Sequence, residues 1–251
     1  MEDRLDRFAA IADIHGNSAA LKAVLDDIDA LGITHTVNLG DHFSGPLDAE
    51  GTADVLIERQ FPSILGNHDR WLLEQSPEQM GPSDRVAYDL LSDAHMGWLQ
   101  GLPATLRIGD VFVCHGTPLS DTTYWMEEVR EDAFVGMASR VWIEDHAGDI
   151  DASLILCGHT HTARAVRLSD GRLLVNPGSV GCPGYDDDTP RFHEMQSGTP
   201  AAAYAILARC PHGWDVTFRQ IPYDTVPMVA LARQNGRAEW ARAIETGWVE
   251  S

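Results

Sequence analysis

Basic residues are scarce in this chain of 251 residues, which has 18 Lys and Arg against 38 Asp and Glu and a formal net charge of −20. Proteins that bind long nucleic acids place Lys and Arg against the phosphates, so we expect no polymeric nucleic acid as a partner. A small phosphate ester is a different ligand, because bound divalent cations can supply positive charge locally inside an acidic protein.

Long apolar runs are also absent. No run approaches the roughly 18 apolar residues of a membrane-spanning helix, and residues 1–7 are charged, without the apolar region of a signal peptide. We therefore expect a cytoplasmic protein with no membrane partner.

The cysteines are few and show no paired spacing; they are Cys114, Cys157, Cys182 and Cys210. A reducing compartment would keep them as thiols. Cys114 and Cys157 end two apolar, strand-like runs that precede candidate ligand histidines, and we expect both to point into the core as structural residues.

Two catalytic motifs are missing. The chain has no Gly-x-Ser-x-Gly elbow for a catalytic triad and no Gly-rich loop followed by Lys for cradling a nucleotide.

The hydrophobic content of 44% supports a large core, and no shift in composition marks a boundary, so we expect a single domain over residues 1–251.

Metal-competent residues are present in five short blocks. In chain order the blocks are Asp13-Ile14-His15, Gly40-Asp41, Gly66-Asn67-His68-Asp69, His115-Gly116 and Gly158-His159-Thr160-His161. Each block follows an apolar, strand-like run, namely residues 8–12, 36–39, 63–65, 111–114 and 154–157. Carboxyl ends of strands form the ligand-binding edge of open α/β sheets. Carboxylate, amide and imidazole donors together suit a pair of borderline divalent ions.

The rest of the pattern predicts a layered α/β protein. Residues 21–31 and 49–59 read as helices that connect the first three strands in parallel, and 105–108 with 111–114 and 166–168 with 173–175 read as hairpins. Strands at 203–208 and 214–220 follow, and the core spans about 7–221.

Three rim inserts interrupt this core. Residues 71–102 read as helices with Val86, Leu90, Leu91 and Trp98 as their apolar stripe; 118–149 includes a helix around 134–142; and 182–200 reads as a loop. A C-terminal helix at about 225–246 is predicted to pack on the outside, with a structural role only.

The order of the five blocks resembles the calcineurin-like metallophosphoesterases. The resemblance implies a four-layer αββα sandwich of two mixed β-sheets flanked by helices, the metallo-dependent phosphatase fold. It implies a first ion held by Asp13, His15, Asp41 and His161, and a second held by Asp41, Asn67, His115 and His159. Asp13 and His15 are two residues apart in the sequence, so their side chains can bind the same ion. The two carboxylate oxygens of Asp41 can bridge the two ions. Mn, Fe, Zn, Ni and Co are all compatible with this donor set.

The resemblance also implies a mechanism. Two ions lower the pKa of a bridging water and hold the phosphate oxygens, and the resulting hydroxide attacks phosphorus. His68 is the catalytic histidine, which assists the leaving oxygen. Asp69 orients His68 or a ligand, or it caps a helix. His42, where relatives commonly carry an apolar residue, either adds a contact behind the ligands or sits on the surface, and the surface position is favoured.

The segment Asn176-Pro177-Gly178-Ser179-Val180-Gly181 narrows the resemblance to the small bacterial and archaeal phosphodiesterase branch. The implied substrates are small phosphodiesters or nucleotide-type esters. The alternatives are a phosphomonoesterase, a dinucleoside-polyphosphate hydrolase, and a protein-interaction scaffold on the same fold. Asn17 is a candidate phosphate contact or a helix cap, and Trp125 a candidate base-stacking residue or part of the core. The oligomeric state and the physiological substrate stay open.

Overall fold

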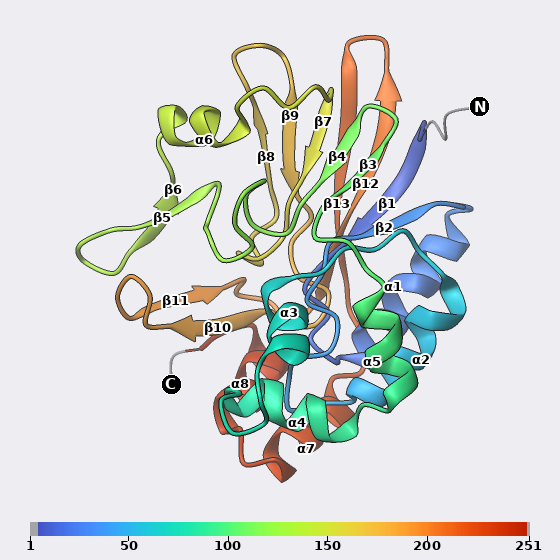
Figure 1. The fold of residues 1–251 in the computed structure, drawn as a ribbon, viewed down its shortest axis with the longest axis vertical. Helices are drawn as coiled ribbons and strands as arrows, with labels where there is room; N and C mark the ends of the chain where they lie inside the picture. Colours follow the sequence, from blue (N-terminus) through green and yellow to red (C-terminus); the bar gives the residue numbers. More distant parts are fainter. Residues whose placement is uncertain (1–4, 250–251) are drawn as a thin grey trace.

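Two β-sheets form the centre of the computed structural model, which describes residues 5–249 (Figure 1). The first four residues of the charged N-terminal segment therefore lie outside the description. The first sheet has the strand order β13-β12-β1-β2, in which β1 (Arg7–Ile11) pairs in parallel with β2 (Thr36–Asn38). Its other two strands, β12 (Ala202–Cys210) and β13 (Gly213–Ile221), are antiparallel.

The second sheet has the order β3-β4-β7-β9-β8. Its three central strands, β4 (Val111–Val113), β7 (Leu154–Leu156) and β9 (Leu173–Asn176), are parallel. The edge strands β3 (Leu106–Ile108) and β8 (Arg164–Arg167) are antiparallel partners of β4 and β9, as the two predicted hairpins require.

Strand alternation places the layers. Phe8 and Ala10 of β1 pack against Leu154 and Leu156 of β7 in a core between the two sheets. The opposite face of the first sheet packs on α1 (Ser18–Ala30) and α2 (Ala49–Arg59), and that of the second sheet packs on α6 (Arg140–Ala147). Figure 1 shows these helices on opposite sides of the sheets. The expected αββα sandwich of mixed sheets is confirmed.

The predicted third parallel strand is reduced to one bridge, between Asn38 and Ser63. Leu65 donates its backbone N–H to the carbonyl of Pro103 and not to β2, so the ladder ends after one pair. Three helices follow: α3 (Asn67–Glu74), α4 (Pro82–Leu90) and α5 (Asp93–Gln100).

The predicted apolar stripe of this insert is wrong in part. Leu90 is exposed, and the buried apolar positions of the three helices are Leu72, Ala87 and Leu99. The short helices turn different faces to the core, so one stripe does not run through all of them.

The predicted helix around 134–142 is wrong for its first half. Val135–Met137 form β6, which pairs with β5 (Glu127–Val129), and α6 begins only at Arg140. The Ser139 side chain accepts from the Trp142 N–H and so sets the start of the helix.

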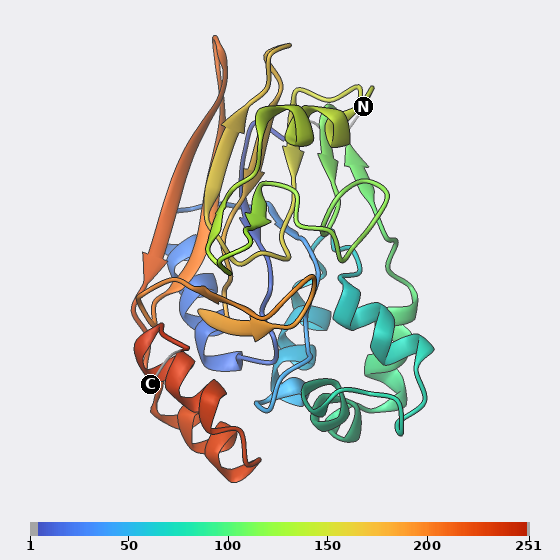
Figure 2. The same ribbon diagram turned by 90° about the vertical axis from the view of Figure 1, so that its left-hand side faces the viewer.

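Residues 182–200 form a hairpin where a loop was predicted. Strand β10 (Gly184–Asp187) pairs antiparallel with β11 (His193–Gln196). The predicted C-terminal helix is likewise a helical hairpin of α7 (Val226–Gln234) and α8 (Ala238–Thr246), broken where Gly236 has φ +72°. Both views place this hairpin beside β10–β11 (Figure 2).

The cysteines are all free, and Cys114 and Cys157 lie in the core under α6, as predicted. Cys210 is exposed. Between residues 5 and 249, none of the helices combines the length and the apolar character needed to cross a membrane.

Candidate metal-binding site

The five sequence blocks converge at one edge of the two sheets. Two groups of ligand-competent side chains result, Asp13 with His15 and His161, and Asp41 with His115 and His159. Within each group the candidate ligand atoms all lie within 4.8 Å of one another. The structure thus separates these side chains into two groups, with Asp41 in the second.

The first group has two imidazole nitrogens in close approach. His15 and His161 place their Nε2 atoms 3.2 Å apart. The Nδ1 atom of each ring lies 2.7 Å from a backbone carbonyl, of Ser44 for His15 and of Cys182 for His161. When Nδ1 donates to these carbonyls, both Nε2 atoms are lone-pair acceptors that face each other. A cation bound by both atoms would remove this unfavourable contact.

The second group repeats this arrangement. His115 Nδ1 lies 2.7 Å from the carbonyl of Leu39, which directs the Nε2 lone pair inward. That Nε2 lies 3.1 Å from Asn67 Oδ1 and 3.2 Å from Asp41 Oδ2. When His115 is neutral, three acceptor atoms therefore converge, and the residues present fit a bound cation that takes the place of the proton.

Asp41 lies between the two groups. Its Oδ2 is 3.2 Å from His115 Nε2 and 3.8 Å from His15 Nε2. Its Oδ1 accepts the backbone N–H of His68 at 3.0 Å, which fixes the orientation of the carboxylate. The Asp41 carboxylate therefore lies where it could contact a cation bound at either group.

The backbone at the site is strained. Five of the candidate ligands have left-handed backbone conformations: Asp13, His15, Asp41, His159 and His161, with φ between 52° and 70°. Such conformations cost about 1 kcal/mol or more each and cluster at functional sites. Because β1 ends at Ile11, the side chains of Asp13 and His15 are directed by these turns and not by strand alternation.

Close approach of two loops requires glycine at one position. A Cβ on Gly66 would lie 2.1 Å from Asp41 Oδ1. Any other residue would displace the carboxylate, so the Gly-Asn-His block starts with glycine for a physical reason.

Buried charge shapes the ionisation of the site. Burial opposes charging of the His115 ring, but the carboxylates of Asp41 and Asp13 outweigh it and raise its pKa to about 10. Burial lowers the pKa of His15 to about 4 and that of His159 to about 3. Burial also raises the pKa of Asp13 to about 8. The negative field at His115 is one that a metal cation would neutralise.

Asp69 is hydrogen-bonded to the backbone of the surrounding loops. Its carboxylate accepts the backbone N–H groups of Gly66 and Asp41 at 2.8 Å and of His42 at 3.0 Å. It therefore closes the first turn of α3 and positions the loop that carries Asp41.

The predicted surface position of His42 is wrong. His42 is fully buried, with Nδ1 2.7 Å from Asp69 Oδ2, and its ring packs on Phe43 and Trp98. The loop after Gly40-Asp41 turns inward toward α5. The His42 ring is therefore buried, although a polar side chain was expected to be exposed.

His68 lies beside the first group and is partly exposed. Its ring centroid is 5.5 Å from that of His15. Its Nδ1 lies 2.7 Å from Asp84 Oδ1 on α4 and 3.2 Å from Ser44 Oγ. Burial lowers its pKa, but the carboxylates of Asp41 and Asp84 outweigh burial and raise it to about 9. The ring therefore tends to be protonated at neutral pH.

The two candidate substrate contacts are contradicted by their burial. Asn17 is fully buried and caps α1 by accepting from the Ala20 N–H, while its amide group donates to Gly181 O and Tyr223 Oη. Trp125 is 1% exposed and donates to the carbonyl of Ile143 in the core under α6. All the hydrogen-bonding groups of Asn17 are in use, and the ring of Trp125 has no free face.

Sequence reasoning missed three supporting residues. Asp84 lies in the first turn of α4, far from any ligand block. Asn176 donates to the Gly158 carbonyl at 2.7 Å and holds the loop of His159. Ser179 donates to the Asp13 carbonyl at 2.7 Å. Only the Asn-Pro-Gly-Ser segment was visible as a motif, and it forms a turn in which Gly178 has φ +83°.

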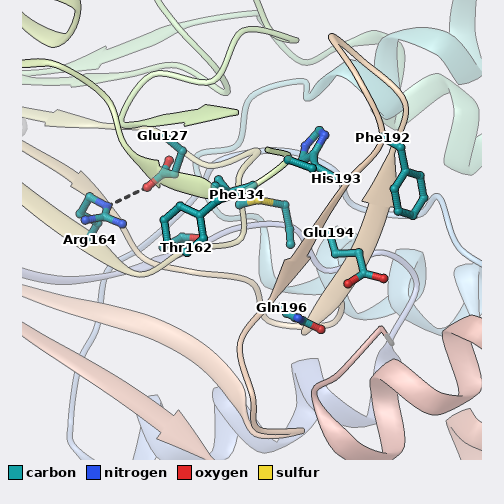
Figure 3. Close-up of a pocket in the computed structure, with 11 residues that line it drawn as sticks. Glu127, Phe134, Thr162, Arg164, Phe192, His193, Glu194 and Gln196 are labelled. Atoms are coloured by element: carbon teal, nitrogen blue, oxygen red, sulfur yellow. Dashed lines mark hydrogen bonds and ion pairs between the residues drawn. The ribbon is translucent and has the colours of Figure 1, made fainter. Parts of the chain in front are cut away.

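A pocket of about 520 Å³ lies between the hairpins β5–β6 and β10–β11 (Figure 3). Thr162, directly after His161, lines it together with Arg164, Phe134 and Phe192. Arg164 pairs with the buried carboxylate of Glu127 at 2.7 Å, as the dashed line in Figure 3 marks. The first basic residue after the fifth block in the sequence is thus already paired with a carboxylate.

Comparisons with known proteins agree with this fold and give the family. The model of the calcineurin-like phosphoesterase superfamily domain matches residues 7–196. An uncharacterized protein of Methanocaldococcus jannaschii is 26% identical over 250 residues, which cover 92% of this chain and 94% of that protein. A metallophosphoesterase structure from Sphaerobacter thermophilus matches with a TM-score of 0.72 and 24% identity, covering 98% of this chain and 100% of that one. A hypothetical protein from Pyrococcus horikoshii matches with a TM-score of 0.71 and 18% identity, covering 97% and 99%.

Proposed function

Because this chain belongs to the calcineurin-like phosphoesterase superfamily, we propose that it hydrolyses small phosphodiesters at a site holding two divalent transition-metal ions. The convergence of lone-pair acceptors at His15, His161 and His115 carries the proposal. We assign the first ion to Asp13, His15, Asp41 and His161, and the second to Asp41, Asn67, His115 and His159. Bound ions of this kind activate water and hold phosphate oxygens.

The residues of the chain supply orientation and a proton. Asp41 is held by the backbone N–H of His68, and the loop before it by Asp69. His68, with its Nδ1 against Asp84, keeps Nε2 available to protonate the leaving oxygen. Asp84 acts as a positioning residue, because it fixes the ring and favours its protonated form.

A diester is favoured over a monoester by the charges near the blocks. Arg70 pairs with Asp121 at 2.7 Å and with Glu74 at 3.1 Å, and Arg164 pairs with Glu127. Neither guanidinium is free to clamp the additional negative charge of a terminal monoester. The singly charged diester fits this site better than a monoester dianion or a dinucleoside polyphosphate.

The direct test combines elemental analysis with hydrolysis. Protein purified with manganese should hold about two equivalents of metal and should cleave bis-p-nitrophenyl phosphate faster than p-nitrophenyl phosphate or a dinucleoside polyphosphate. Chelation should abolish activity, and Asp41→Asn should lose at least one ion and most activity. Asp26→Asn, an exposed acidic position on α1, is the matched control. One equivalent of metal with full activity would contradict the two-ion site, and full activity after chelation would contradict metal dependence.

A further inference from the structure

Four rings form a continuous row along one side of the metal-binding site. Trp71, His68, His15 and Trp240 follow one another with centroid separations of 4.7, 5.5 and 5.9 Å. Each contact is edge to face, with interplanar angles of 79°, 78° and 67°. Both indoles are partly exposed. Trp71 and Trp240 therefore lie at the two ends of the row. Between them lie His68, the proposed proton donor, and His15, a proposed metal ligand.

Trp240 reaches the site from the far end of the chain. It lies on α8, in the C-terminal hairpin to which the sequence assigned no chemical role. Its ring edge lies close to Gly45, where an added Cβ would meet Trp240 Cη2 at 3.4 Å. Gly45 directly follows Ser44, whose carbonyl holds His15, so the indole sits against the loop that orients this histidine.

The hairpin is anchored on that same loop. Leu47 packs with Met228 and Ile244 in a buried cluster, and Asn235 donates to the Pro46 carbonyl at 3.0 Å. On the other side Arg237 donates to Ser83 Oγ at 2.8 Å, next to Asp84. Three contacts therefore fix Trp240 relative to the site, which makes the indole a preorganised wall.

We propose that Trp240 contacts the retained ester group of a phosphodiester substrate and selects a planar aromatic group, such as a nucleobase, at that position. This inference rests on the proposed function. His68 assists the leaving oxygen, and Trp71 adjoins His68, so Trp71 lies on the leaving-group side. Trp240 lies beyond His15, at the opposite end of the row, and so faces the group that stays on phosphorus. Aromatic faces bind bases without reading their sequence.

Two substrates with one leaving group isolate this contact. Thymidine 5′-p-nitrophenyl phosphate and ethyl p-nitrophenyl phosphate both release p-nitrophenolate and differ only in the retained group. Trp240→Leu should lower kcat/KM for the thymidine ester by roughly 5- to 140-fold, which corresponds to about 1–3 kcal/mol of base stacking. Its effect on the ethyl ester should stay within about twofold. Trp240→Phe keeps a ring and should retain most of the preference.

Binding gives a second readout, and Trp248→Leu is the matched control. Trp248 is an exposed tryptophan in the same C-terminal segment that packs near Gly198, away from the ring row. In calorimetry with thymidine 5′-monophosphate, Trp240→Leu should weaken affinity by the same factor, and Trp248→Leu should leave it unchanged. Metal content and melting temperature are measured for each variant.

Equal losses on both esters, or no loss on either, would overturn the role of Trp240. Failure of the proposed function is distinguishable, because wild-type protein would then cleave neither ester or would keep its activity after chelation. In that case the calorimetric comparison still decides whether Trp240 binds the nucleoside. Undiminished binding by Trp240→Leu would refute the inference.

Discussion

Asp84 offers the sharpest test of how His68 works. The two residues come from different helices, and His68 Nδ1 lies 2.7 Å from a carboxylate whose side chain is only 5% exposed. Asp84→Asn keeps a side chain of the same size that can still accept a hydrogen bond, but it removes the charge. The substitution therefore separates the electrostatic contribution of Asp84 from its contribution to packing.

The magnitude follows from the type of hydrogen bond. A bond to a charged group contributes about 1.5–3 kcal/mol and a neutral bond about 0.5–1.5 kcal/mol, so the change removes about 1–1.5 kcal/mol of preference for protonated His68. At about 1.4 kcal/mol per factor of ten, the protonated fraction of His68, and with it kcat, should fall roughly 5- to 10-fold when measured above the wild-type pKa of the ring. The pKa of His68, raised to about 9, should fall as well. A general acid must be protonated, so the alkaline decline of kcat should begin at a lower pH in the variant.

The assay is steady-state hydrolysis of phosphodiesters with good and poor leaving groups, with metal content measured in parallel. The poor leaving group should show the larger loss, because it depends more on protonation. Asp89→Asn is the matched control, since Asp89 lies on the same helix but is exposed and pairs with Arg85.

The double variant His68→Ala/Asp84→Asn tests whether Asp84 acts only through His68. His68→Ala should reduce kcat by about 100-fold or more with metal retained, and adding Asp84→Asn should then change nothing further, because Asp84 acts only through the ring. A further 5- to 10-fold loss in the His68→Ala background would refute this reasoning and assign Asp84 an independent role.

Three further outcomes are expected. Asp69→Ala should lower the free energy of unfolding by about 3–5 kcal/mol in chemical denaturation and weaken metal binding, because buried amides including that of Asp41 lose their acceptor; unchanged stability would contradict its bracing role. Trp125→Ala should cost about 3–5 kcal/mol of stability while shifting KM equally for aryl and nucleoside diesters, and a selective shift would restore a stacking role. The pKa of His115 is raised to about 10 by its carboxylate neighbours, so its contribution to stability of the metal-free protein is present below about pH 6.5 and is lost as pH rises toward 10. A metal ion must displace the proton of His115, so the affinity for the metal, measured by calorimetry, should increase as the pH rises toward 10. A metal affinity that does not change with pH would exclude a charged His115 in the metal-free protein.

Much of the site could be anticipated from sequence because its ligand types cluster in short blocks. Asp13, Asp41, His115 and His159 each stand a few residues after an apolar run. Parallel strands bring their carboxyl ends to one edge, so order along the chain predicts proximity in space. The αββα arrangement was implied by the resemblance to the family, and in the structure the residues of β1 and β7 alternate between two apolar layers, as that arrangement requires.

Local elements were predicted less well where tertiary contacts override propensity. Residues 182–200 carry Gly, Pro and Asp and read as a loop, yet the pairing of β10 with β11 makes them a hairpin. Val135 to Met137 continue a helical pattern in sequence but pair with β5. Strand pairing depends on a partner distant in the chain, which local periodicity does not contain.

The sequence by itself determined the family, the layered fold and the set of ligand-competent side chains, because these depend on residue types and their order. Only the tertiary structure decided which residues support them. It brought Asp84 to His68, buried His42 against Asp69, and excluded Asn17 and Trp125 from substrate contact. It also carried Trp240 from the end of the chain to His15. Such contacts depend on how helices pack across the sheet edge, and residues that meet only through packing leave no spacing pattern in the sequence.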